Sequence, residues 1–278
     1  MMKSKAPLTV GVFDSGLGGL SILGAIRALL PELDYDYCCD NLNFPYGTKS
    51  EWEVISAAER VTRLFFDATH LDVLVIACNT ASVVALESIR KNLPIPVIGV
   101  VPAVKPAAQA SKTKVIGVLA TPVTVARPYL DILIKNFAAD CRVVKVGSSK
   151  LVTLAEDKMR RRRGQGDLHL EEIRTEVDAI VAEAKVGLDQ LVLGCTHFPL
   201  LAEELRQVIP KSVNFVDSGL AVASRVRTVI EEHYGFMSHS GASRQGRVHG
   251  FCSGDPFEIY LPGNISGVDE IFGLRKLN

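Results

Sequence analysis

The stretch Leu71-Asp-Val-Leu-Val-Ile-Ala-Cys78 decides the fold, because most of it returns later in the chain as Leu188-Asp-Gln-Leu-Val-Leu-Gly-Cys195. Five of the eight positions are identical. Both copies are continuous apolar runs, which are typical of strands buried on both faces of a parallel sheet. A polar pair follows each cysteine, Asn79-Thr80 or Thr196-His197, and a helical pattern follows each pair. The sequence therefore predicts a duplicated strand–turn–helix unit.

Short β-branched runs alternate with helical patterns along the rest of the chain. We expect strands at residues 8–13, 36–39, 73–77, 97–101, 115–119, 142–146, 190–194, 213–216 and 248–252. A capping box, Ser50 with Glu53, opens a helix that runs to about Thr69. Further helices are expected after Gly19, Thr80, Thr124, Leu168, Pro199 and Gly219. This alternation predicts an α/β protein with two pseudo-symmetric, doubly wound, mainly parallel sheet domains and the active site in the cleft between them.

A second, shorter sequence repeat, or echo, indicates where the chain passes from one domain to the other. Asp14-Ser15-Gly16-Leu17 is repeated as Asp217-Ser218-Gly219-Leu220, in each case straight after an expected strand. Since these echoes lie near the two ends of the chain, we expect the last segment to return to the first domain. The predicted first domain is residues 1–101 plus 214–278, and the predicted second domain is residues 102–213.

Composition and charge exclude several classes of protein. The chain has 278 residues, with 31 lysines and arginines against 31 aspartates and glutamates, which excludes a globally basic nucleic-acid binder. No apolar run is long enough to span a bilayer, and the first residues lack a secretory signal pattern. Six cysteines without a C-x-x-C pair argue against a disulfide scaffold or a structural zinc site. We expect a cytoplasmic protein that binds no metal, no membrane and no nucleic acid.

Two of the six cysteines are candidates for catalysis. Cys78 and Cys195 each lie where a strand ends and a helix begins, and we expect the helix N-terminus to lower their thiol pKa. Two thiols on opposite walls of one cleft suit two-base chemistry, in which one removes a proton and the other returns one to the opposite face. Nothing in the sequence suggests a pyridoxal, nicotinamide or metal cofactor. The remaining cysteines are interpreted as core packing: Cys38, Cys39, Cys141 and Cys252.

Other motifs supply candidate partners for these thiols. The run Val10 to Ser21 fails the dinucleotide fingerprint because Ser21 stands where the third glycine is required. Asp14 in that run suits a substrate ammonium group or support of a nearby base. The loop Asn43 to Ser50 can hold a carboxylate with its N–H groups and the Tyr46 hydroxyl. His197 can tune Cys195 or relay protons to it.

The four arginines Arg160 to Arg163 are interpreted as a solvated helix end or loop, with an anionic partner or RNA as the less favoured alternative.

Two other functions stay open for the cleft that contains Cys78 and Cys195. A cysteine hydrolase would use one of the thiols as its nucleophile, and a binding protein would use the same cleft without catalysis.

Taken in order, several of these segments resemble the glutamate racemases of the cofactor-independent aspartate/glutamate racemase superfamily, with aspartate racemases as the nearest alternative. The resemblance covers nearly the whole chain. The matching stretches are Gly11 to Gly19, Pro45 to Lys49, Ala77 to Ser82, Ile98 to Val100, Ala120 to Thr124, Gly194 to Leu200, Asp217 to Gly219 and, more weakly, Ser253 to Asp255.

The resemblance implies two similar α/β domains and reversible interconversion of L- and D-glutamate without a cofactor, which supplies D-glutamate for peptidoglycan. It implies that Cys78 is the base for D-glutamate and Cys195 the base for L-glutamate, supported by Asp14, His197 and Glu156. A homodimer is an assembly that the sequence leaves open. The implied substrate-binding residues are Asp14, Ser15, Pro45, Tyr46, Gly47, Asn79, Thr80, Thr121, Cys195, Thr196 and His197.

Two segments depart from the family pattern. Leu151 to Glu156 keeps the acidic residue but lacks a proline that family members often have. Cys39-Asp40 stands where Gly-Asp is usual, and the common arginine is absent from the loop that follows.

Overall fold

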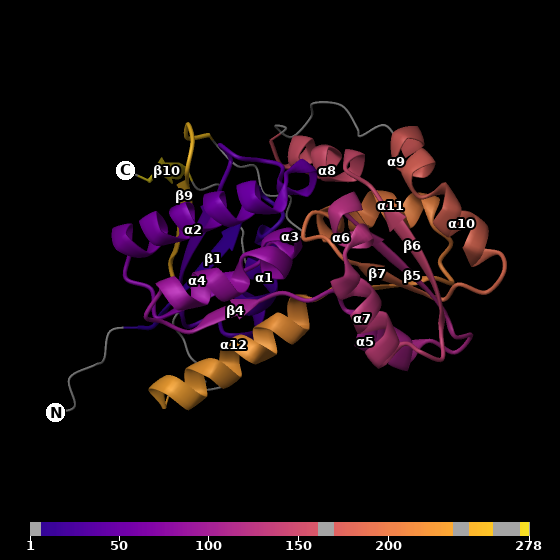
Figure 1. Ribbon diagram of the computed structural model, residues 1–278, viewed down its shortest axis with the longest axis horizontal. Coiled ribbons are helices and arrows are strands. Elements are labelled where there is room, and N and C mark those ends of the chain that lie inside the picture. The colour runs from indigo at the N-terminus through magenta and orange to yellow at the C-terminus, as the bar shows by residue number, and fades with distance from the viewer. Residues whose placement is uncertain (1–6, 161–169, 236–244, 258–272, 278) are drawn as a thin grey trace.

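The computed structural model of the protein contains two parallel β-sheets that lie side by side, each flanked by helices (Figure 1). It describes residues 7–160, 170–235, 245–257 and 273–277. Every strand pairing within these residues is parallel. The predicted α/β class is therefore confirmed.

The first sheet has six strands in the order β10-β9-β2-β1-β3-β4. Five of them were expected, and β10 was missed because it is short and has two exposed residues. The bounds are β1 Thr9–Asp14, β2 Asp34–Cys39, β3 Val73–Ile76, β4 Val97–Gly99, β9 Val248–Cys252 and β10 Leu274–Lys276.

The second sheet has four strands in the order β6-β5-β7-β8, which is the order β2-β1-β3-β4 repeated. All four were expected, and β7 and β3 carry the repeated sequence. The bounds are β5 Val115–Ala120, β6 Arg142–Gly147, β7 Gln190–Leu193 and β8 Asn214–Val216.

Close packing also repeats between the two sheets. A Cβ at Gly11 in β1 would lie 2.6 Å from a methyl of Leu71, and a Cβ at Gly117 in β5 would lie 3.1 Å from a methyl of Leu188. The two leucines are the first residues of the repeated stretch, so each copy packs over the glycine of its neighbouring strand. The shared strand order and this shared contact support the predicted duplication.

The two copies of the second sequence echo do not occupy equivalent positions in the two sheets. Asp14 ends β1, whereas Asp217 follows β8, which corresponds to β4 and not to β1. Instead, Ser218 donates a hydrogen bond to the carbonyl oxygen of Val101 (2.6 Å), which ties together the two segments that cross between the sheets. Because β8 pairs with β7, the return crossing follows Val216 and not residue 213 as expected.

Helices cover both faces of the first sheet. One face packs against α1 (Leu20–Leu29) and α12 (Gly219–Tyr234), and the other against α2 (Glu51–Ala68), α3 (Asn79–Val84) and α4 (Leu86–Asn92). Successive strand residues serve opposite faces, as period-two geometry requires. The capping box at Ser50 is present and starts α2 at Glu51.

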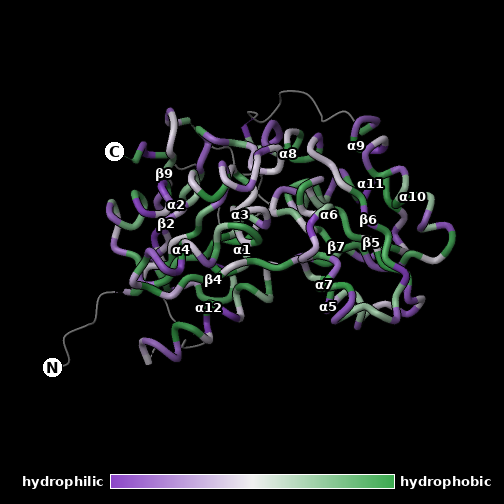
Figure 2. The backbone as a smooth tube through the Cα atoms, in the orientation of Figure 1, coloured by the Kyte–Doolittle hydropathy of each residue, from purple (hydrophilic) through white to green (hydrophobic). Residues whose placement is uncertain are grey.

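The second sheet is also covered on both faces, so both sheets are doubly wound. On one face lie α5 (Val104–Ala110), α6 (Pro122–Ala126) and α7 (Pro128–Phe137); the expected helix after Thr124 begins earlier, at Pro122. The other face carries α8 (Lys150–Arg160), α9 (Leu170–Glu176), α10 (Asp178–Ala184) and α11 (Ala202–Val208). Hydrophobic residues concentrate on the strands and hydrophilic ones on the outer turns of the helices (Figure 2).

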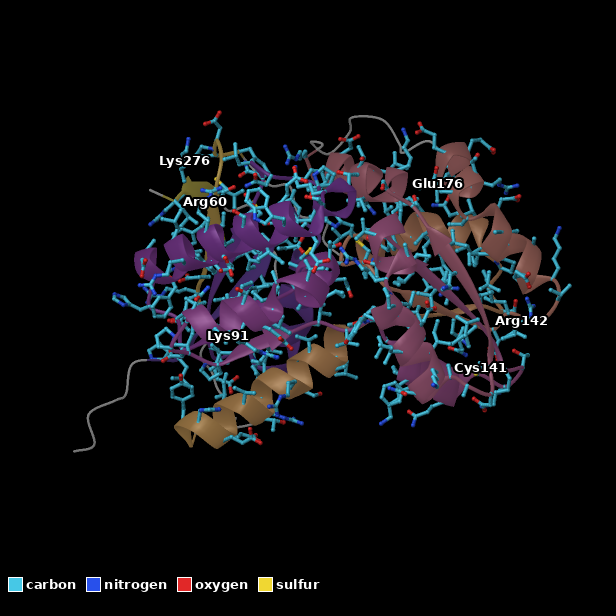
Figure 3. All side chains as sticks on the ribbon, in the orientation of Figure 1. Arg60, Lys91, Cys141, Arg142, Glu176 and Lys276 are labelled. Atoms are coloured by element: carbon cyan, nitrogen blue, oxygen red, sulfur yellow. The ribbon has the colours of Figure 1, made fainter. Side chains whose placement is uncertain are left out.

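The four cysteines interpreted as packing residues are not all alike. Cys38, Cys39 and Cys252 are fully buried in the first domain. Cys141 is only half-buried and lies beside Arg142 at the outer end of the second sheet (Figure 3). Of the arginine run, Arg160 is the last residue of α8, and residues 161–163 lie outside the described residues. In the part of the chain that is described, no helix is long and apolar enough to cross a membrane.

Candidate active site

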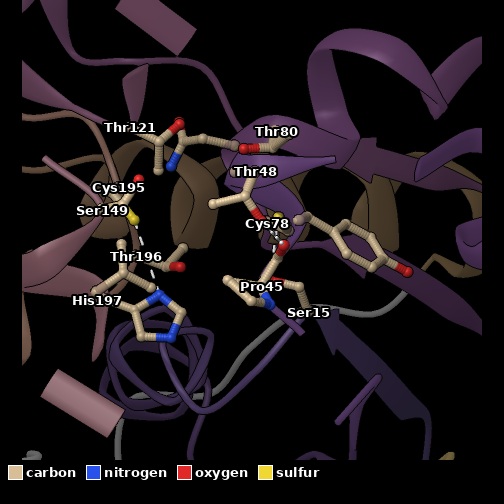
Figure 4. A pocket seen from close by; sticks show the side chains of 14 residues that line it. Ser15, Pro45, Thr48, Cys78, Thr80, Thr121, Ser149, Cys195, Thr196 and His197 are labelled. Atoms are coloured by element: carbon tan, nitrogen blue, oxygen red, sulfur yellow. Dashed lines mark hydrogen bonds between the residues drawn. The ribbon is translucent and has the colours of Figure 1, made fainter. Parts of the chain in front are cut away.

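A pocket lies between the two sheets, at the carboxyl ends of their strands (Figure 4). This is where open α/β sheets bind ligands, because polar loop residues and helix N-termini converge there. The lining residues are Ser15, Pro45, Tyr46, Gly47, Thr48, Cys78, Asn79, Thr80, Thr121, Ser149, Val152, Cys195, Thr196 and His197.

The duplication explains why two cysteines meet in this pocket. Cys78 comes two residues after the end of β3, and Cys195 comes two residues after the end of the equivalent strand, β7. Likewise, Ser15 directly follows β1 and Thr121 directly follows the equivalent strand, β5. The two cysteines lie on opposite sides of the pocket (Figure 4), so each can face a different side of one small ligand.

Cys195 lies at the end of a chain of ionisable groups. Its Sγ is 3.7 Å from Nδ1 of His197, and Nε2 of His197 is 2.8 Å from Oε1 of Glu156. Burial lowers the pKa of His197, but the hydrogen bonds with Cys195 and Glu156 raise it more, so the net pKa lies well above its usual range. The imidazole can therefore hold a proton and donate it toward the Cys195 sulfur.

Glu156 is held by contacts around both sheets. It belongs to α8, which covers the second sheet, and accepts a hydrogen bond from the backbone N–H of Leu17 in the loop after β1 of the first sheet. Burial raises the pKa of its carboxyl, but the hydrogen bond from His197 and the charge of that residue bring the net pKa below its usual range. Its carboxylate form is thus kept in place beside His197, although Glu156 does not line the pocket.

Cys78 has a different environment. Its Sγ lies 3.6 Å from the hydroxyl of Ser15, and it is 6% exposed. Burial, together with the charge of Asp14, raises the pKa of Cys78 to about 12. The expectation that the helix N-terminus would lower this pKa was wrong, because loss of solvation outweighs the field of a helix only six residues long.

Asp14 lies behind the pocket wall. It is fully buried, accepts a hydrogen bond from the N–H of Gly16 (3.2 Å) and receives the hydroxyl of Thr196 at 3.3 Å. Burial raises the pKa of its carboxyl, opposed in part by the charge of His197. Since Asp14 is outside the lining, its contact with a ligand would require a shift of the loop, whereas support of the nearby residues does not.

The glycine loop after β1 allows the domains to approach each other closely. A Cβ on Gly16 would clash with Glu156, and one on Gly18 would clash with the ring of His197 and with Thr196. The glycines of this run do not form a dinucleotide motif. Instead, the absence of side chains at Gly16 and Gly18 leaves room for Glu156 and His197, on the Cys195 side of the pocket, to pack against the loop after β1.

The loop from Pro45 to Thr48 lines the pocket as expected, but one of its groups is already used. The hydroxyl of Tyr46 donates to Oδ2 of Asp40 at 2.7 Å. The expectation that this hydroxyl can hold a carboxylate was wrong, and the loop offers its backbone instead.

One residue of the pocket lining has an unsatisfied acceptor. Oδ1 of Asn79 is buried and has no hydrogen-bond partner among the residues that the structure describes. Buried amide oxygens are rarely left unpaired unless a ligand or water completes them. Asn79 begins α3 directly after Cys78, so an N–H donor of a bound molecule would lie beside this cysteine.

Most predicted site residues come together here, and a few lining residues were missed. All predicted residues except Asp14 and Glu156 line the pocket. Sequence reasoning missed Ser149 and Val152, and it included Thr48 only as part of the Asn43 to Ser50 loop. Ser149 follows the end of β6, so the rule that identified the cysteines identifies it as well. Val152 carries no polar signal in the sequence.

Comparison with known proteins agrees with this geometry. The sequence profile of the Asp/Glu/Hydantoin racemase family matches residues 20–226. A glutamate racemase of Shewanella sp. (strain MR-4) is 50% identical over 221 residues, which is 80% of this chain and 79% of that protein. A glutamate racemase of Actinobacillus pleuropneumoniae serotype 7 is 44% identical over 88% of each chain.

Solved structures of glutamate racemases are similar to this chain over about nine tenths of its length. The crystal structure of Escherichia coli glutamate racemase, in complex with L-glutamate and the activator UDP-MurNAc-ala, superposes with a TM-score of 0.79 at 40% identity. The match covers 89% of this chain and 90% of that one. The RacE1 isoform of glutamate racemase from Bacillus anthracis matches with a TM-score of 0.74 at 28% identity, over 90% of each chain.

Proposed function

The chain belongs to the Asp/Glu/hydantoin racemase family, and from that premise we propose that it interconverts L- and D-glutamate by proton transfer at Cα between Cys78 and Cys195. The observation that carries the mechanism is the pair of cysteines at equivalent strand ends, on opposite sides of one pocket. The product D-glutamate supplies peptidoglycan synthesis, and thereby cell-wall biogenesis and cell shape.

The proposed reaction consumes nothing. A thiolate on one cysteine takes the Cα proton of the bound amino acid, which leaves the electron pair as a carbanion delocalised into the α-carboxylate. The thiol of the other cysteine then delivers its proton to the opposite face of Cα and becomes the thiolate. The reverse reaction exchanges the two roles. We assign Cys195 as the base for L-glutamate and Cys78 as the base for D-glutamate.

The neighbours of each thiol suit these roles. On one side, His197 and Glu156 stabilise negative charge on Cys195, because the imidazolium can donate Nδ1–H toward the sulfur. On the other side, the raised pKa of Cys78 favours its thiol form in the unliganded site. The Ser15 hydroxyl would help this sulfur carry charge once it loses its proton, and Asp14 orders the surrounding loop.

The remaining lining groups suit an amino acid with two carboxylates. The unpaired Oδ1 of Asn79 would accept a hydrogen bond from the substrate ammonium group. Donors for the two carboxylates are the backbone of the Pro45–Thr48 loop and the pocket hydroxyls. These hydroxyls belong to Ser15, Thr80 and Thr121, since the hydroxyl of Thr196 already donates to Asp14.

The wider setting of the enzyme is also a proposal. We divide the chain into a first domain of residues 1–101 with 217–278 and a second domain of residues 102–216, on the membership of the two sheets. Both thiols must be reduced to move protons, which favours the cytoplasm. We propose a homodimer, in which a second copy would cover exposed apolar side chains such as Trp52, which is 75% exposed. Sedimentation velocity tests this assembly.

The experiment for the activity follows pure L-glutamate and pure D-glutamate by circular dichroism with purified protein in D₂O. We expect both signals to decay to zero while deuterium enters Cα, and aspartate to react far more slowly. A binding protein would leave the signal unchanged, and a cysteine hydrolase would give a covalent adduct by mass spectrometry. Either of those results would overturn the proposal.

A further inference from the structure

Asp40 is a buried carboxylate that the proposed mechanism does not use. It follows the last residue of β2, next to the end of β1, and its N–H donates to the carbonyl oxygen of Asp14 at 2.9 Å. It is completely buried. A buried carboxylate is costly unless hydrogen bonds satisfy it, so the groups that donate to Asp40 define what it holds in place.

Three side chains donate to this carboxylate. Tyr46 donates its hydroxyl to Oδ2 at 2.7 Å, and Asn43 Nδ2 lies 3.0 Å from each oxygen. Both belong to the segment that enters the pocket as the Pro45–Thr48 loop. The third donor is the hydroxyl of Ser253, which bonds to Oδ1 and comes from a distant part of the chain.

Ser253 reaches Asp40 because β9 pairs with β2. The register places Cys252 opposite Cys39, so the residues after both strands lie side by side. The N–H of Ser253 donates to the carbonyl oxygen of Cys39 at 3.1 Å, and the N–H of Gly254 donates to Oδ1 of Asn41 at 2.7 Å. The backbone hydrogen bonds of Ser253 and Gly254 thus fix the position from which the Ser253 hydroxyl donates to Asp40.

From this chain of contacts we propose that Asp40 is a positioning residue for substrate binding, and that Ser253 from the C-terminal segment sets its orientation and, through Tyr46, the loop that lines the pocket. This rests on the proposed function, since the loop is assigned there to the substrate carboxylates. The family profile matches residues 20–226, so the C-terminal segment with Ser253 lies outside it.

The contacts also define which kinetic constant should respond. The loop from Pro45 to Thr48 lines the pocket. In the proposed function its backbone binds the substrate carboxylates, which are the same in the ground state and the transition state. Loss of such uniform binding raises KM and leaves kcat nearly unchanged. A purely structural role would instead lower the fraction of active enzyme, which reduces the apparent kcat at constant KM.

The test compares Ser253→Ala with Ser111→Ala. Ser111 makes the matched contact, a hydroxyl that donates to a carboxylate at 2.6 Å. Its partner Asp189 directly precedes β7, so it lies at the amino end of that strand, whereas the pocket lies at the carboxyl ends. For Ser253→Ala we expect KM for glutamate to rise about fivefold and kcat to stay within about twofold, as the loss of one hydrogen bond implies. Ser111→Ala should leave KM unchanged even if it melts at a lower temperature.

Three further variants separate a positioning role of Ser253 from a general loss of folding. Ser253→Thr restores the hydroxyl and should return KM to near the wild-type value. In the Tyr46→Phe background, Ser253→Ala should raise KM little further, because both changes act through the same hydrogen-bonded path. Asp40→Asn keeps the size of the side chain and should raise KM at least as much as Ser253→Ala.

A readout independent of activity keeps this inference separate from the proposed function. Hydrogen–deuterium exchange of the peptide covering residues 44–50 should be faster in Ser253→Ala than in wild type, and unchanged in Ser111→Ala. If the wild type racemises glutamate but Ser253→Ala alters neither KM nor this exchange, the inference is wrong and the function stands. If the wild type does not racemise glutamate, the function fails, and the exchange result alone decides whether Ser253 positions the loop.

Discussion

Replacement of Glu156 by glutamine tests how the Cys195 side of the pocket works. Glutamine keeps the size of the side chain and an oxygen that can accept the N–H of Leu17. It removes the negative charge that lies 2.8 Å from Nε2 of His197. The hydrogen bond that His197 donates to Glu156 is one of the contacts that raise the pKa of His197, so this pKa falls in the variant.

The size of the effect follows from the lost charge, because the glutamine oxygen can still accept a hydrogen bond from His197. A hydrogen bond to a charged group contributes about 1.5–3 kcal/mol and a neutral one about 0.5–1.5 kcal/mol, so about 1–1.5 kcal/mol is lost from the transition state, which slows a reaction roughly 5- to 10-fold. The two enantiomers of glutamate have equal free energies in water, so their equilibrium constant is one. We therefore expect kcat/KM to fall by the same factor of about 5–10 in both directions, even though Glu156 lies on one side only.

The protonation of His197 determines the direction in which the pH profile of kcat/KM should shift. A raised pKa means that the His197 imidazolium is present at low pH and is lost only as the pH rises through that pKa. In Glu156→Gln the pKa is lower, so the alkaline limb of the kcat/KM profile should move to lower pH. Circular dichroism progress curves on L- and D-glutamate across a range of pH measure both effects.

A matched control removes a carboxylate that does not reach the pocket. Glu204 pairs with Lys158, which lies on the same helix as Glu156, and the pair is largely buried. Glu204→Gln should leave kcat/KM and the alkaline limb at their wild-type values. The reasoning fails if Glu156→Gln keeps wild-type kcat/KM, or if its alkaline limb moves to higher pH.

Three further predictions follow from close packing and burial. Gly18→Ala places a methyl against the ring of His197 and should lower kcat/KM more than tenfold in the same circular dichroism assay, whereas near-normal activity would mean that this loop has room to move. Gly11→Ala sets a Cβ 2.6 Å from a Leu71 methyl and should lower the free energy of unfolding by about 1–3 kcal/mol in urea denaturation; an unchanged midpoint would contradict this. Without substrate, iodoacetamide should label Cys78 more slowly than free cysteine, with a rate that keeps rising through alkaline pH as its raised pKa implies; fast labelling at neutral pH, located by peptide mass mapping, would refute it.

The strands were predictable from sequence, whereas several helices were not. The apolar runs of β1, β3, β5 and β7 are buried on both faces, so hydrophobicity alone marks them. In contrast, α5 has a proline among small residues and no clear apolar stripe, so it is stabilised mainly by packing that no local pattern records. The helix α8 was also missed, although Leu151, Leu154, Ala155 and Met159 do form an apolar stripe at helical spacing.

The site was predictable where the chain repeats itself. The duplicated stretch identified Cys78 and Cys195 and predicted that they face one cleft. It did not reveal that burial raises the pKa of Cys78, because this burial depends on packing with residues distant in the chain, such as Phe13 and Tyr46. Nor did it reveal that the Tyr46 hydroxyl is taken by Asp40, because that contact depends on the path of a loop.

The measurement that tests the central claim most directly is proton exchange in single-cysteine variants, with Cys141→Ala as the control. In D₂O, neither Cys78→Ala nor Cys195→Ala should racemise glutamate, since each lacks one of the two bases. Each should still exchange the Cα proton of one enantiomer at the surviving thiol: D-glutamate for Cys195→Ala and L-glutamate for Cys78→Ala. Racemisation by either variant at the rate of Cys141→Ala would contradict the two-thiol mechanism.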